Sequence, residues 1–260
     1  MPNTNNNNVD IHYEIEGQGP PLLLMHGLTS SMVAWKRYGY VEELRMNYML
    51  ILVDARGHGG SGKPHDSQAY STELMTGDVV AVLDDLGIDR AVYWGYSMGG
   101  MIGLELPRHY SSRFTAYIIG GMSPYRSVTE RQSESWMNTS LRVGAEAGPE
   151  AYVSILEKHL GSPAEDEKAR MLENDYKAIY ALWENMSRWP ATVDLLPSIT
   201  SPCLFYTGDE DVYHDGAKEA AKRIQKATFV SVPNLVHLAA YMRSDLVLPH
   251  LKRFLKSVTI

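Results

Sequence analysis

The stretch Gly95-Tyr96-Ser97-Met98-Gly99-Gly100 directly follows the apolar run Ala91-Val92-Tyr93-Trp94. An apolar run followed by Gly-x-Ser-x-Gly predicts a buried strand, a sharp turn at the serine and then a helix. Glycine is needed two residues before and two residues after the serine, because side chains there would collide with the neighbouring strand and helix. The alternative is a glycine-rich turn with an incidental serine. The stretch predicts that Ser97 is a nucleophile displayed at the end of a strand.

The overall composition indicates a globular chain without a nucleic-acid or membrane partner. Of the 260 residues, 44% are hydrophobic and 21% are charged, and the net charge of −7 supplies no basic patch for phosphate groups. No apolar segment approaches the ~18 residues of a membrane span. The first eight residues lack the basic start and apolar centre of a signal peptide. We expect a cytoplasmic protein, and the sequence carries no signal of its oligomeric state.

Short apolar runs alternate with helical stretches, which predicts an α/β fold with a mostly parallel central sheet flanked by helices. The expected strands are 9–16 (an antiparallel edge strand), 21–25, 49–53, 91–94, 114–119, 203–207 and 228–232. Between 125 and 197 only helical stretches occur, and we interpret this segment as an inserted helical cap. The cap divides the α/β core into residues 9–124 and 198–260. Residues 1–8, rich in asparagine, are expected to form a disordered tail.

The nucleophile needs a base, because a serine hydroxyl is weakly nucleophilic unless an imidazole, itself held by a carboxylate, accepts its proton. After a Gly-x-Ser-x-Gly turn the acid and then the histidine follow in chain order, each on a loop after a strand. Of nine histidines, only His237 stands directly after the last predicted strand, 228–232. His237 is therefore the expected general base.

Two aspartates compete for the role of the acid. Asp209 and Asp211 both follow the predicted strand 203–207, in the sequence Thr-Gly-Asp-Glu-Asp. The residue just after a strand usually makes the turn, which leaves the second aspartate better placed to reach inward. We favour Asp211, with Asp209 as the alternative.

The developing oxyanion of an acyl-transfer reaction needs two hydrogen-bond donors. One expected donor is the backbone N–H of Met98, at the start of the helix after the serine. The other is the backbone N–H of Leu28, in the loop after strand 21–25. Gly27 allows this loop to approach closely, and His26 is expected to shape the loop rather than act as a base.

The chain resembles the α/β-hydrolase superfamily over nearly everything after the asparagine tract. The motifs that carry the resemblance occur in the family's order and spacing: His26-Gly27, Asp54-Ala55-Arg56-Gly57-His58-Gly59, Gly95 to Gly100, Gly208 to Asp211, and His237. The resemblance implies an α/β-hydrolase fold in which Asp54 and Arg56 belong to the scaffold. It is strongest to small esterases and lactonases such as the 3-oxoadipate enol-lactonase-like branch.

The expected function is therefore a serine hydrolase that cleaves a small-molecule carboxylic ester or lactone through an acyl-enzyme on Ser97. Serine at this position argues against haloalkane dehalogenases and epoxide hydrolases, which need an aspartate there. Two other activities stay open: perhydrolysis, and C–C bond hydrolysis of the meta-cleavage-product type, for which Arg126 or Arg188 would have to bind a carboxylate. A noncatalytic binding protein is disfavoured, because every expected site residue is present. No cofactor and no metal is expected.

Aromatic and methionine side chains are the candidates for substrate contact. Tyr176, Tyr180 and Trp183 recur at helical spacing in the cap, and Trp136 lies nearby in the sequence. Such a stripe either packs the cap onto the core or contacts substrate, and different rings can do each. Met122 follows a predicted strand end and is expected to line an apolar acyl pocket together with Met98. We predict Met122, Trp136 and Trp183 as substrate-binding residues.

Overall fold

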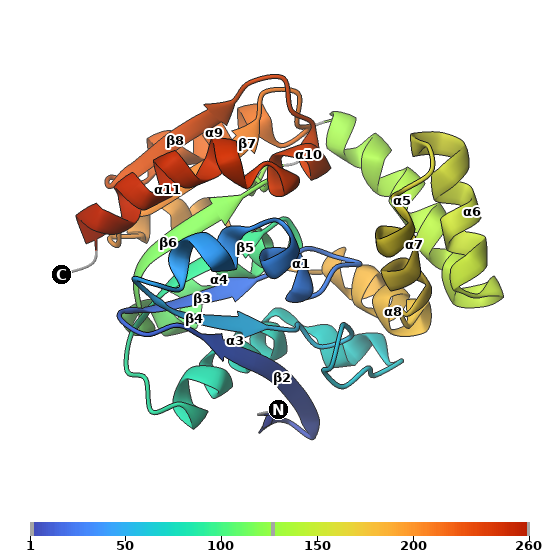
Figure 1. Cartoon of the computed structure of the whole chain (residues 1–260), viewed down its shortest axis with the longest axis horizontal. Coiled ribbons are helices and arrows are strands. Elements are labelled where there is room, and N and C mark those ends of the chain that lie inside the picture. Colours follow the sequence, from blue (N-terminus) through green and yellow to red (C-terminus); the bar gives the residue numbers. More distant parts are fainter. Residues whose placement is uncertain (1–2, 126–127, 259–260) are drawn as a thin grey trace.

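Eight strands form one sheet in the computed structural model, which describes residues 3–125 and 128–258 (Figure 1). The strand order is β1-β2-β4-β3-β5-β6-β7-β8, and all neighbours from β4 to β8 run parallel. The strands are β1 (Asn3–Asn6), β2 (Val9–Glu16), β3 (Pro21–Met25), β4 (Met49–Val53), β5 (Ala91–Tyr96), β6 (Phe114–Gly120), β7 (Cys203–Gly208) and β8 (Ala227–Val232). The predicted α/β class and mostly parallel sheet are confirmed.

Helices cover both faces of the sheet, which explains why its central strands are continuous apolar runs. Successive strand residues point to opposite faces, so Leu23 and Ile51 join one buried cluster, and Leu22 and Leu50 join another. The first cluster includes residues of α3 (Thr72–Asp85), α4 (Met98–Tyr110) and α9 (His214–Arg223). The second includes residues of α1 (Val33–Arg37), α2 (Tyr40–Leu44), α10 (His237–Met242) and α11 (Ser244–Val258).

A group of helices stands between β6 and β7 in the sequence and lies beyond the carboxyl ends of the parallel strands (Figure 1). These are α5 (Val128–Ala147), α6 (Pro149–Leu160), α7 (Glu165–Leu172) and α8 (Tyr176–Met186), which we call the cap helices. They share a separate buried cluster that includes Leu141, Tyr152 and Ile179. Short 3-10 helices complete the chain: η1 (Ser67–Tyr70), η2 (Ser111–Arg113) and η3 (Val193–Ser198). Among the described residues no strand lies between β6 and β7.

The expected disordered tail is wrong for residues 3–8. They form β1 and a tight turn, and β1 pairs antiparallel with β2, with Asn6 opposite Val9. Asn7 and Asn8 have φ angles of 51° and 62°. A two-residue hairpin turn favours positive φ at both positions, and asparagine tolerates this conformation better than most residues. The tract is therefore a hairpin, and β1 rather than β2 is the edge strand.

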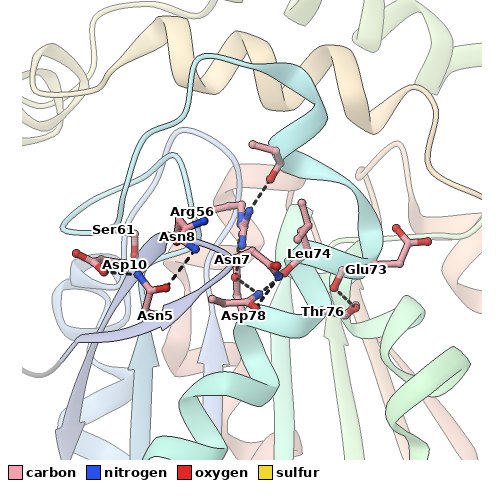
Figure 2. Close-up of polar contacts among 12 residues, drawn as sticks. Asn5, Asn7, Asn8, Asp10, Arg56, Ser61, Glu73, Leu74, Thr76 and Asp78 are labelled. Atoms are coloured by element: carbon pink, nitrogen blue, oxygen red, sulfur yellow. Dashed lines mark hydrogen bonds and ion pairs between the residues drawn. The ribbon is translucent and has the colours of Figure 1, made fainter.

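A buried ion pair anchors this hairpin to the core. Arg56 donates to both carboxylate oxygens of Asp78 in α3, at 2.6 and 2.5 Å, and both side chains are at most 2% exposed. Figure 2 shows the two side chains facing each other beside the asparagine hairpin. The Asn6 amide donates to Asp78 Oδ1 at 2.8 Å and to the Leu74 carbonyl oxygen at 3.3 Å. Burial raises the pKa of Asp78, while Arg56 and Asn6 oppose this rise.

We expect Asn6→Ala to lower the free energy of unfolding by about 1–3 kcal/mol, because it leaves a buried carboxylate with one hydrogen bond fewer. Asn5→Ala is the matched control, since among the described residues the Asn5 side chain hydrogen-bonds to the exposed Asp10 side chain and the turn residue Asn8 and to no buried group. The control should change stability by less than about 0.5 kcal/mol. Urea unfolding of the two variants measures the difference. Equal midpoints would show that the hairpin is not anchored through Asn6.

Candidate active site

Ser97 occupies a strained turn between β5 and α4. Its φ and ψ angles are 53° and −113°, outside the regions that non-glycine residues usually adopt. A Cβ atom on Gly95 would lie 2.1 Å from the Gly99 carbonyl oxygen, and one on Gly99 would lie 2.3 Å from the Met25 carbonyl oxygen. Neither position can therefore hold a larger residue without moving backbone. This close packing keeps Ser97 at the strand end.

The structure brings Ser97, His237 and Asp211 together in one hydrogen-bonded row. His237 Nε2 lies 3.0 Å from Ser97 Oγ, and His237 Nδ1 lies 2.9 Å from Asp211 Oδ2. The Asp211 side chain is fully buried, whereas that of His237 is 33% exposed. The three residues come from three separate segments: the β5–α4 turn, the loop after β7 and the first residue of α10.

The two candidate aspartates lie in different surroundings. Asp209 is exposed, and its carboxylate accepts from the Leu235 N–H at 3.4 Å. Asp211 is buried, and its Oδ1 accepts from the Tyr213 N–H at 3.0 Å while its Oδ2 faces His237. An ionised carboxylate can only accept hydrogen bonds, so this pairing places the imidazole proton on Nδ1. His237 Nε2 is then free to accept the proton of the Ser97 hydroxyl.

A close approach of two loops allows His237 to reach this row. A Cβ atom on Gly208 would lie only 1.8 Å from the Leu235 carbonyl oxygen, so the end of β7 contacts the backbone of the loop before α10. The Glu210 N–H donates to the same carbonyl at 3.2 Å. Asn234 completes the bend with a φ of 57°. Glycine at position 208 is thus a condition for the contact between His237 and Asp211.

The loop after β3 lies against the serine. A Cβ atom on Gly27 would lie 3.3 Å from Ser97 Cβ and 3.9 Å from Ser97 Oγ. Within the described residues, the backbone N–H groups of Leu28 and Met98 donate to no protein acceptor. Met98 is the first residue of α4, and the first N–H groups of a helix have no partner inside it. Both N–H groups are therefore available to a ligand.

Two buried histidines hold this loop rather than act on a substrate. His26 Nδ1 donates to the Gly27 carbonyl oxygen at 2.8 Å, and its Nε2 accepts from the Ala55 N–H at 3.1 Å. His58 Nε2 accepts from the Thr29 N–H at 3.2 Å. Burial lowers the pKa of His26, and it lowers the pKa of His58 to about 3. Both rings are therefore neutral at pH 7, as their acceptor roles require.

Asp54 and Arg56 stabilise the backbone next to the site. Asp54 is buried and accepts from the N–H groups of Met32 and Gly60, both at 2.8 Å. Arg56 is the partner of the buried Asp78 described above. Neither side chain hydrogen-bonds to Ser97 or His237 in the described part of the chain, and both hold the turn after β4.

The predicted substrate-binding residues lie in different surroundings. Met122 is buried beside the start of α4, since a Cβ atom on Gly100 would lie 2.8 Å from the Cβ atom of Met122. Trp183 in α8 is half-buried, packs against both the core and the cap clusters, and donates to Asn138 Oδ1 at 3.1 Å. The ring of Trp136 in α5 packs edge-on against His159, 5.9 Å away.

The remaining cap residues named from the sequence are mostly packing residues. Tyr176 is buried, and its ring centroid lies 4.4 Å from that of Tyr152 in α6. Tyr180 packs at the edge of the same cap cluster. Arg188 is exposed, and Arg126 lies outside the described residues.

Tyr96 is a site residue for which the sequence motif predicts no role. Its hydroxyl donates to the His237 carbonyl oxygen at 2.6 Å. Its ring stacks on Tyr241 with centroids 4.4 Å apart and lies 5.5 Å from the His237 ring. The available signal was its place directly before the serine, where a strand residue must point away from the nucleophile toward a neighbouring layer. Tyr96 thus ties the serine turn to the histidine segment.

Residues 3–125 and 128–258 contain neither a cluster of metal ligands nor a membrane-spanning helix. No group of three or more histidine, cysteine, aspartate or glutamate side chains is arranged to hold a metal ion. None of the described helices is both long and apolar enough to cross a membrane.

Comparisons with known proteins agree with this topology. The family model described as alpha/beta hydrolase fold matches residues 20–141. "Putative carbamate hydrolase RutD" of Azorhizobium caulinodans is 32% identical over 59% of this chain and 55% of its own length. 3-Oxoadipate enol-lactonase 2 of Acinetobacter baylyi is 33% identical over 43% of this chain and 41% of its own length. The chain thus spans about half of these two curated relatives.

A solved structure matches the whole fold. The crystal structure of the enol-lactonase from Burkholderia xenovorans LB400 superposes with a TM-score of 0.81, covering 98% of this chain and 100% of that one, at 23% identity. The present chain combines the sheet order given above with a serine turn between β5 and α4 and with the cap helices between β6 and β7. The chain has the α/β-hydrolase fold.

Proposed function

We propose that this protein is a serine hydrolase that cleaves a carboxylic ester or lactone through an acyl-enzyme on Ser97. The observation that carries the proposal is the hydrogen-bonded row from Ser97 through His237 to the buried Asp211, with distances of 3.0 and 2.9 Å. A nucleophile, a base and a carboxylate that orients the base are the groups that acyl transfer requires.

Acylation begins when Ser97 Oγ attacks the substrate carbonyl carbon. The hydroxyl proton passes to His237 Nε2, and the Asp211 carboxylate stabilises the imidazolium that results. The carbonyl oxygen becomes an oxyanion, which accepts hydrogen bonds from the N–H groups of Leu28 and Met98. When the tetrahedral intermediate collapses, the bond to the leaving oxygen breaks and His237 returns its proton to that oxygen.

Deacylation repeats these steps with water as the nucleophile. His237 accepts a proton from the water, whose oxygen bonds to the acyl carbon, and the bond from that carbon to Ser97 Oγ then breaks. The proton returns to Ser97, and the carboxylic acid product leaves. From an ester the alcohol has already departed, whereas a lactone gives one ring-opened hydroxy acid or its keto form.

Three further observations support an ester or lactone substrate. The Asp211 side chain is fully buried and accepts from the Tyr213 N–H, which fixes its orientation toward His237. Two backbone N–H groups beside Ser97 are free of protein acceptors among the described residues. Arg188, the described candidate for binding the carboxylate of a C–C hydrolase substrate, is exposed two residues beyond the end of α8. The relatives named above, "Putative carbamate hydrolase RutD" and an enol-lactonase, also support a hydrolase of this kind.

A fluorophosphonate tests the proposed nucleophile. We expect one covalent adduct on the wild-type protein by intact mass, because Ser97 is activated by His237, and no adduct on Ser97→Ala. A folded wild-type protein that stays unmodified, or a mutant that is modified equally, would contradict the proposal. A panel of short esters and lactones then ranks the substrate classes by kcat/KM.

The two aspartates provide a matched pair of variants. We expect Asp211→Asn to lower kcat by roughly 10³- to 10⁴-fold, because the amide favours the wrong imidazole tautomer. Asp209→Asn keeps the oxygen that accepts from Leu235 and should change kcat by less than about twofold. Steady-state kinetics with one activated ester measures both. The opposite ranking would assign the acid to Asp209.

A further inference from the structure

The loop that carries the Leu28 N–H is a turn in an unusual conformation. The Ser30 N–H donates to the Gly27 carbonyl oxygen at 3.2 Å, so Leu28 and Thr29 are its central residues. Thr29 has a φ of 62°. This position of a turn ordinarily holds glycine or asparagine when φ is positive, and a β-branched residue is unfavourable there. Something outside the turn must therefore hold Thr29 in place.

Both backbone polar groups of Thr29 are held, one by the core and one by the cap helices. On the core side, its N–H donates to Nε2 of the buried His58 at 3.2 Å. On the cap side, its carbonyl oxygen accepts from the Asn174 amide at 2.9 Å. Asn174 lies between α7 and α8.

The conformation of Thr29 controls the geometry of the turn beside Ser97. A turn with positive φ at its second central residue differs from the commonest type by a flip of the central peptide, here the Leu28–Thr29 peptide. That flip would remove the Thr29 N–H from His58 and change the ψ angle of Leu28, whose N–H directly precedes the flipped peptide. The Leu28 side chain packs against both the core cluster and the cap cluster, so its position depends on both.

We propose that Asn174 is a positioning residue that couples the cap helices to the oxyanion-binding turn. By holding the Thr29 carbonyl, it keeps the unfavourable turn conformation in which the Leu28 N–H faces the reacting carbonyl oxygen. The turn is then formed correctly only while the cap helices are docked on the core. This inference rests on the proposed serine hydrolase function.

Another contact between the cap and the core serves as the control. Arg37 in α1 pairs with Asp166 at 2.8 Å and with Glu167, both in α7. This contact joins the same two parts of the molecule but does not touch Thr29. Arg37→Met therefore removes one contact between the cap helices and the core without removing a hydrogen bond from the turn.

The first experiment compares Asn174→Ala with Arg37→Met on a short activated ester. We expect Asn174→Ala to lower kcat by about 10- to 100-fold, because it displaces one oxyanion donor without deleting it, while KM changes by less than about threefold. Asn174→Ala should also weaken the binding of a trifluoromethyl ketone, which forms a tetrahedral adduct with the serine. The loss of affinity should equal the loss of kcat/KM. Arg37→Met should change each quantity by less than about threefold.

Three results would overturn the inference. A wild-type value of kcat in Asn174→Ala would show that the hydrogen bond between Asn174 and Thr29 has no role in catalysis. An equal loss in Arg37→Met would show that general docking of the cap, and not the Thr29 contact, matters. A loss of kcat without a matching loss of trifluoromethyl ketone affinity would mean that the oxyanion site is unaffected.

A second variant tests the turn itself. Glycine adopts positive φ readily, so Thr29→Gly should hold the turn conformation without the cap. Adding Asn174→Ala to Thr29→Gly should therefore lower kcat by less than about threefold, far less than in the wild-type background. Full additivity of the two losses would contradict the coupling.

Fluorophosphonate labelling separates this inference from the proposed function. If wild-type Ser97 is not labelled, the serine hydrolase proposal fails and the inference with it. If the wild type is labelled and Asn174→Ala reacts at the same rate, the inference alone fails. We expect labelling of Asn174→Ala that is slower by about the factor seen in kcat/KM.

Discussion

The strained backbone at Ser97 is the constraint on which the site depends. A non-glycine residue at a φ of 53° persists only when its surroundings fix it. Here the Ser97 N–H donates to the Gly120 carbonyl at 2.8 Å, and the Gly99 N–H donates to the His26 carbonyl at 3.2 Å. The turn is thus bonded to the ends of both strands that flank β5, namely β6 and β3. A side chain at Gly95 or Gly99 would break this packing.

The order of the parallel strands explains why residues far apart in the sequence meet at this turn. Ligands of open α/β sheets bind outside the carboxyl ends of the strands. The loops after β3, β5, β7 and β8 leave the sheet at that edge, and they carry Leu28, Ser97, Asp211 and His237. Tyr96 and Gly208 then draw the histidine segment toward the serine and the aspartate. The site is a property of the sheet edge as much as of any one motif.

Local motifs were sufficient to predict the fold class and the positions of the strands that frame the site. The Gly-x-Ser-x-Gly turn and the order of the acid and the histidine are short-range signals with strict geometric requirements. At the N-terminus the composition gave the wrong prediction, because an asparagine tract is typical of disordered chain. The partner that orders it is the buried carboxylate of Asp78, which is far away in the sequence and accepts from Asn6. Asn174 shows the same limit, since a lone cap asparagine gains its role only through the Thr29 carbonyl.

The most direct measurement of the central claim is detection of the acyl-enzyme itself. The protein is mixed with a slowly deacylated activated ester, quenched in acid during turnover, and examined by intact mass and peptide mapping. We expect a single acyl group, located on Ser97, that disappears as the ester is exhausted. Turnover of the ester with no acyl group on Ser97, or with the acyl group on another residue, would contradict the account.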